Sequence, residues 1–135
     1  MIRKTMTAFA LALALPSLAL PETAVAEGAL SVQITPRSAQ DRQALALGLA
    51  LYGIAAGQGS GAEIRQRGRG NAAALRQSGK GHVGVIHQDG RGHQARLAQR
   101  GRGHAMGIFQ FGENTSARVR QRGSGQTGLL LQFGW

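Results

Sequence analysis

A short repeated unit decides the fold, and its clearest copy reads Ala73-Ala74-Leu75-Arg76-Gln77-Ser78-Gly79. Glutamine returns every eleven residues, at Gln66, Gln77, Gln88, Gln99, Gln110, Gln121 and Gln132. An aliphatic residue stands two places before each glutamine, at Ile64, Leu75, Ile86, Leu97, Ile108, Val119 and Leu130. Glycine follows two places after it, at Gly68, Gly79, Gly90, Gly101, Gly112, Gly123 and Gly134. Such a period predicts one structural unit that buries its surface by stacking on its neighbours.

The eleven-residue period is compatible with two kinds of structure. It suits a right-handed helical supercoil as well as a strand followed by a turn. Most units, however, carry a pair of glycines, as at Gly68 and Gly70 or at Gly90 and Gly92. Because each glycine inside a helix costs about 1 kcal/mol relative to alanine, the repeats exclude a helix and favour a strand and a turn.

Alternation along such a strand gives it two different faces. Ala73, Leu75 and Gln77 fall on one face, and the residues between them fall on the other. The first face is nearly uniform in all copies, whereas the second mixes arginine, histidine, alanine, phenylalanine and leucine. The uniform face is therefore expected to pack against copies of itself. The glycines of the linking segment, such as residues 67–71, would supply the positive φ that a turn needs.

These features predict an all-β fold, a two-sheet β-solenoid in which two eleven-residue units make a coil of 22 residues. Odd-numbered units would form one sheet and even-numbered units the other, with equivalent residues about 4.8 Å apart along the stack. An inward glutamine could then hydrogen-bond to the glutamines above and below it, which explains a polar residue inside the core. The same stacking between chains would give cross-β amyloid.

The repeat resembles that of the curlin family, in which Gln-x-Gly-x-x-Asn-x-Ala recurs between short strands. The closest copy begins at Gln66, with Gly68, Asn71 and Ala73 at the matching positions, and the likeness covers residues 64–135. Later copies depart from the family at the Asn position, which is filled by His82, His93, His104, Thr115 and Gln126.

The resemblance implies a structural subunit of extracellular curli-like amyloid fibres. Curlins include a major fibre subunit and a minor subunit that nucleates fibre growth at the cell surface. An apolar leader and arginine-rich repeats favour the minor subunit here, and the major subunit is the alternative. The partners implied are further copies of the chain, another curlin subunit and the outer-membrane curli secretion machinery.

Residues 1–26 are expected to be a signal peptide. Arg3 and Lys4 precede an apolar stretch, and Ala24, Val25 and Ala26 form a small-x-small cleavage site. The protein would then pass through the periplasm and act outside the cell, in a fibre at the cell surface.

Residues 27–61 are expected to form a cap or an attachment region before the solenoid of residues 62–135. Residues 31–35 could form a short strand that ends at Pro36. Residues 44–56 are apolar throughout; alternating leucines favour a strand, while the alanine and leucine content favours a helix. This segment would either cover the first coil or attach to the membrane or secretion machinery. At the other end, Phe133, Trp135 and the leucines of residues 129–131 would either dock on another chain or fray.

The chain is strongly basic, with a formal charge of +10. Such a charge attracts polyanions, for which lipopolysaccharide and extracellular DNA are candidates. Four cations share one position of the repeat and are expected to act as gatekeepers against premature aggregation or as polyanion contacts, namely Arg69, Lys80, Arg91 and Arg102. A different class of protein is the alternative: an exported basic Arg/Gly-rich protein that binds nucleic acid or another polyanion.

The sequence predicts no catalytic, metal-binding or cofactor-binding residues and no small-molecule substrate. No nucleophile motif is present, and the chain has no cysteine. His82 and His104 should stack in the solenoid, with His93 on the other sheet, but their spacing matches no compact zinc pattern. Protonation of stacked imidazoles is instead expected to slow assembly in acid.

Overall fold

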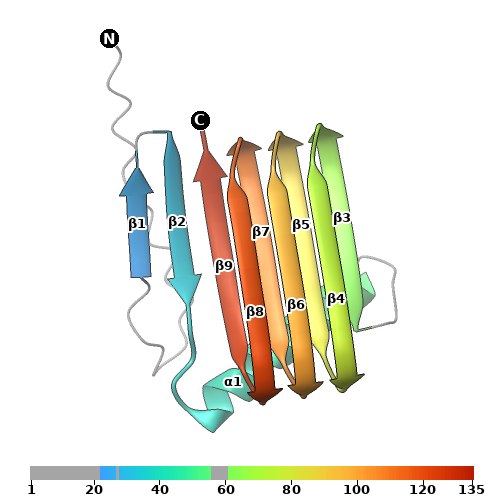
Figure 1. Ribbon diagram of the computed structural model, residues 1–135. Coiled ribbons are helices and arrows are strands. Elements are labelled where there is room, and N and C mark those ends of the chain that lie inside the picture. Colours follow the sequence, from blue (N-terminus) through green and yellow to red (C-terminus); the bar gives the residue numbers. More distant parts are fainter. Residues whose placement is uncertain (1–21, 27, 56–60) are drawn as a thin grey trace.

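The computed structural model describes residues 22–26, 28–55 and 61–135. Most of the predicted signal peptide, residues 1–21, lies outside this range. The elements follow one another as β1 (Glu22–Ala26), β2 (Ala29–Ile34), α1 (Ala39–Ala55), β3 (Ala62–Arg69), β4 (Ala72–Lys80), β5 (Val83–Arg91), β6 (Gln94–Arg102), β7 (Ala105–Glu113), β8 (Ser116–Ser124) and β9 (Thr127–Gly134) (Figure 1).

The repeats form two facing sheets, as predicted. Strands β3, β5, β7 and β9 run parallel in a six-stranded sheet, whose order is β1-β2-β9-β7-β5-β3. Strands β4, β6 and β8 form a three-stranded parallel sheet. Neighbouring strands are in a register of one coil, so that Gln66 lies opposite Gln88 and Gln77 opposite Gln99. The chain is therefore a β-solenoid of about three turns with a coil of about 22 residues.

The core lies between the two sheets. Ile86 and Ile108 from one sheet and Leu97 from the other are almost completely buried. Small residues such as Ala95 and Ala117 complete this cluster. Most strands therefore direct a small residue, an aliphatic residue and a glutamine toward the interior, in the order that the alternation predicts, while β7 has Met106 in the first position.

Most of the repeated glycines have the positive φ that the sequence predicts, but not all of them lie in turns. The glycines two places after each glutamine lie within the strands, and the turn itself follows at the second glycine, as at Gly92 with φ +71°. At Gly68 and Gly90 φ is +111° and +127°, which L side chains rarely adopt. A Cβ at either position would also collide with the backbone carbonyl of the next coil. The strands are thus longer and the turns shorter than expected.

Helix α1 covers the outer face of the six-stranded sheet. It begins after Ser38, whose side-chain oxygen accepts a hydrogen bond from the backbone N–H of Asp41 at 3.0 Å, as an N-cap does. Leu49 packs in a cluster with Val85 and Leu129, and the helix contacts β5, β7 and β9. This segment thus covers the solenoid, but it lies mainly over β5, β7 and β9 and not over the first coil as expected.

Strand β2 covers the end of the solenoid that β9 would otherwise leave open (Figure 1). It pairs antiparallel with β9, with Ser31 opposite Gln132, and β1 pairs antiparallel with β2. The last repeat strand is thus paired within its own chain. The sequence predicted that this strand would either fray or dock on another chain, and the structure shows neither. Because β1 falls inside the predicted signal peptide, cleavage after Ala26 would leave β2 as the edge strand.

Candidate assembly interface

Glutamine side chains form two continuous hydrogen-bonded ladders along the solenoid. In the six-stranded sheet, Gln66 donates to Gln88, Gln88 to Gln110 and Gln110 to Gln132, each at 2.8 Å. In the three-stranded sheet, Gln77 donates to Gln99 at 2.8 Å and Gln99 to Gln121 at 2.9 Å.

The second hydrogen of the interior amides also has a partner. Gln88 donates it to the backbone carbonyl of Ala72 at 2.9 Å, and Gln110 to that of Gln94 at 2.8 Å. Both side chains are fully buried. A buried amide that lacked these partners would cost about 1–3 kcal/mol, so the ladder is what allows a polar residue inside the core.

A second ladder runs through the turns. The sequence predicts the stack of His82 and His104 but not the hydrogen bonds of this ladder. Nε2 of His82 lies 2.8 Å from the carbonyl oxygen of Ser78, and its Nδ1 accepts the backbone N–H of His104 at 3.3 Å. Asn71 does the same with its amide, which donates to Arg67 O at 3.2 Å and accepts the N–H of His93 at 3.1 Å.

A neutral imidazole can replace a carboxamide at this position, because both offer an N–H donor on one side and an acceptor on the other. A carbonyl oxygen only accepts, so the proton of His82 lies on Nε2. The rings of His82 and His104 are stacked, 5.2 Å apart and 5° from parallel. Their shared place in the repeat was the signal that could have revealed this role. In the described ranges no group of His, Cys, Asp or Glu side chains could hold a metal ion.

The four cations of the repeat lie in pairs at the ends of the strands. Arg69 is in register with Arg91 in one sheet, and Lys80 with Arg102 in the other. Glu113, which interrupts the series, forms an exposed ion pair with Arg91, with Nη2 and Oε1 2.6 Å apart. Exposed pairs of this kind contribute little to stability, typically about 1 kcal/mol or less.

The outer faces of the two sheets differ in chemistry. That of the six-stranded sheet is apolar over β7 and β9 and lies under α1, while that of the three-stranded sheet has no helix over it in the described part of the chain (Figure 1). Exposed arginines occupy this second face, namely Arg76, Arg96, Arg100, Arg118, Arg120 and Arg122. This face is a stronger candidate for a polyanion contact than the cations at the strand ends.

The two ends of the solenoid also differ. In the part of the chain that the structure describes, β3 and β4 are the outermost strands of their sheets at one end. Ile64 of β3 is 40% exposed although its equivalents Ile86 and Ile108 are buried, and Gln66 is exposed. At the other end, Gln132 donates to the hydroxyl of Ser31 at 3.2 Å, so that β2 supplies the acceptor that another coil would supply. Among the described residues, the β3–β4 end is thus the open end of the solenoid.

No protein-family model, curated protein or solved structure matches this chain. No described helix is long and apolar enough to span a membrane.

Replacing Gln110 with leucine should destabilise the solenoid strongly. The variant would leave the amide of Gln88 and the oxygen of Gln132 without their partners inside the core. We expect the free energy of unfolding to fall by about 2–4 kcal/mol, as measured by chemical denaturation. The matched control is Gln66→Leu at the exposed end, which removes only the donor to Gln88 and should cost about half as much or less. Equal losses in the two variants would contradict the ladder.

His87 should make the stability of the protein depend on pH. Its Nδ1 and the Tyr52 hydroxyl are hydrogen-bonded at 2.6 Å beneath α1. Burial lowers the pKa of His87 below 6.5, an effect that nearby Asp89 opposes and Arg65 reinforces. The unfolded chain then binds this proton more readily than the folded chain, so the free energy of unfolding should fall as the pH drops below about 6.5.

Denaturation at pH 7.5 and pH 5 tests this dependence. His87→Gln should lose less stability between the two pH values than the unchanged chain does. An unchanged difference in the variant would show that His87 makes no contribution.

Proposed function

We propose that this protein is a structural subunit of extracellular curli-like amyloid fibres. The observation that carries the proposal is the open end, where β3 and β4 present the same repeat pattern that stacks inside the solenoid. An unprotected strand edge recruits further strands. A strand from another chain that carries glutamine in the same register would continue both ladders beyond Gln66 and Gln77.

Within such a fibre, the difference between the two ends favours the minor, nucleating subunit. A bulk subunit must accept neighbours at both ends, whereas β2 occupies the place of the next coil beside β9. A chain with one open end can start a fibre that grows in one direction. The major subunit remains the second candidate, since displacement of β2 would open the other end. Either subunit would be exported through the periplasm and the outer-membrane secretion machinery.

The cations at the open end support a gatekeeping role. Arg69 and Lys80 are exposed at the ends of the two edge strands. An incoming strand with a cation at the same position would be repelled until salt or an anionic surface screened the charge. Fibre growth would therefore be slow during export and faster at an anionic cell surface.

The exposed arginines on the three-stranded sheet favour a second candidate function, which is binding of lipopolysaccharide or extracellular DNA. A protein that only bound polyanions would need the exposed arginines for binding and nothing else of the repeat. The buried glutamine ladders have no part in that function, and for this reason we place the fibre role first.

The variant Ile64→Lys tests growth at the open end. Growth there would bury the lysine in a new core layer without a partner, which is costly. We expect the rate of fibre elongation to fall by about tenfold or more, measured by amyloid-dye fluorescence and electron microscopy. The stability of the soluble chain should change little, because Ile64 is 40% exposed.

Ala74→Lys is the matched control, since it places the same charge on the outer face of the other edge strand. Its elongation rate should stay close to that of the unchanged chain. If Ile64→Lys fibres grow as fast as those of the control, growth does not occur by stacking on β3 and β4.

A further inference from the structure

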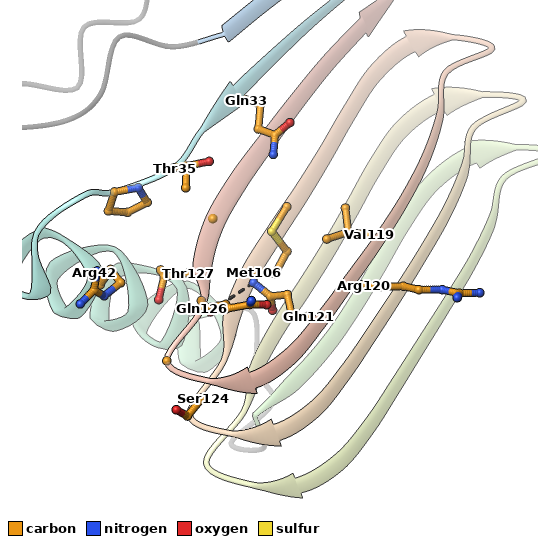
Figure 2. Close-up of a pocket in the computed structure, with 13 residues that line it drawn as sticks. Gln33, Thr35, Arg42, Met106, Val119, Arg120, Gln121, Ser124, Gln126 and Thr127 are labelled. Atoms are coloured by element: carbon orange, nitrogen blue, oxygen red, sulfur yellow. Dashed lines mark hydrogen bonds between the residues drawn. The ribbon is translucent and has the colours of Figure 1, made fainter.

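A groove of about 600 Å³ lies beside β8, at the end opposite to the open end. Val119 and Gln121 of β8 line one side of it, and Met106 lies next to them (Figure 2). Gln33 and Thr35, from β2 and the residue after it, border the other side. The groove thus combines apolar side chains with the last glutamine of one ladder.

The groove occupies the place of one missing strand. In the six-stranded sheet, β2 adds a further strand beyond β9, but in the three-stranded sheet no described strand lies beyond β8. A strand placed there would face β9 across the core, as β8 faces β7. Since β2 already closes the other sheet, the space fits a single strand and not a whole coil.

Two side-chain positions show that this layer of the solenoid is unfilled. Gln121 donates its amide to the backbone oxygen of Gln126 at 3.2 Å, whereas Gln88, Gln99 and Gln110 donate to a glutamine of the next coil. A Cβ at Gly123 would meet nothing within 4 Å, whereas at Gly101 it would collide with the backbone of Gly123. At both positions, therefore, the described chain lacks the next strand that the interior repeats contact.

The charge beside the groove indicates the chemistry of that neighbour. The outward residues of β8 are Arg118, Arg120 and Arg122, all exposed. Arg96 and Arg100 of β6 already lie in register with the first and last of these. Like charges on adjacent strands are destabilising, while opposite charges contribute roughly 0.2–1 kcal/mol for each pair. An incoming strand with outward carboxylates would therefore be favoured.

The strands of this chain do not fit that description. Each described repeat strand carries at most one carboxylate, namely Glu63 in β3, Asp89 in β5 and Glu113 at the end of β7. Glu63 is accompanied by two outward arginines in the same strand, Arg65 and Arg67. A further copy of this chain would thus bring its own positive charge to β8.

The geometry points to a docking site for one strand of a different chain, bound parallel to β8. Its inward side chains would follow the small–aliphatic–glutamine pattern of the repeat, and its outward side chains would be acidic. The inference rests on the proposed fibre role and adds to it the end and the partner through which this subunit attaches. The fibre would grow from the β3–β4 end, while the acidic partner would hold the β8 end.

A synthetic peptide can serve as the probe. It has the sequence of residues 116–124, with glutamate in place of Arg118, Arg120 and Arg122. Its affinity for the purified chain, measured by fluorescence anisotropy, should be at least about tenfold higher than that of the same peptide with the three arginines. The difference should shrink at high salt. Equal binding of the two peptides would overturn the assigned partner chemistry.

Disulfide cross-linking locates the bound peptide, because the chain has no cysteine of its own. Arg118→Cys on β8 should cross-link to a peptide cysteine at the aligned position and not to one placed a residue later, which faces the core. Arg76→Cys, an outward position on the opposite edge strand β4, is the matched control.

The cross-linking outcomes separate this inference from the proposed fibre role. In-register cross-linking at position 118, and not at position 76, supports the docking site. Cross-linking at position 76 alone would overturn the site while leaving growth at the open end intact. No cross-link at either position would also overturn it, and elongation by the Ile64→Lys variant would still test the fibre role independently.

Discussion

The hydrogen bond between stacked glutamine amides is the interaction on which the rest of the structure depends. It lets a polar side chain sit in a dry core, and it fixes how one coil lies on the next. A strand that slipped by one residue would turn its glutamine outward and, in most repeats, an arginine inward. A slip of two residues would break every amide contact in the ladder. The apolar residues supply burial, and the glutamines supply register.

The same ladder makes the ends of the solenoid functionally important. An interior coil satisfies its amides on both sides, so an end coil always has an unused position. The end strands of this solenoid differ in what lies next to them. Strand β2 covers β9, with a contact through Ser31, and the edge of β8 borders a groove. Strands β3 and β4 lie at the open end. The fibre proposal and the docking proposal concern the last two of these positions.

The solenoid could be predicted from the sequence because its information is local and repeated. The glutamine period gave the coil length, the two sheets and the inward residues such as Ile86 and Leu97. The covering of the far end could not be predicted, because Ser31 and Gln132 are 101 residues apart and no periodic pattern joins them. The sequence of α1 fits both a strand and a helix. Its leucines alternate as in a strand, but Leu45, Leu49 and Tyr52 also fall on one side of a helix.

The candidate interface was predicted in part. The spacing of the glutamines predicts their ladder. It does not predict that the glycine two places after each glutamine lies within a strand, because a sequence does not reveal that a backbone carbonyl of the next coil lies against it. The histidines were considered as a possible stack without their hydrogen bonds. The arginines of the even-numbered units stay exposed, while α1 packs against the sheet of the odd-numbered units. This difference depends on where α1 packs, which only the tertiary structure defines.

Fibre diffraction from the purified chain after quiet incubation tests the central claim most directly. If coils of neighbouring chains stack as they do within one chain, reflections should appear near 4.8 Å along the fibre axis and near 10 Å across it. A chain that stays soluble at high concentration, with neither reflection, would contradict self-assembly through the open end.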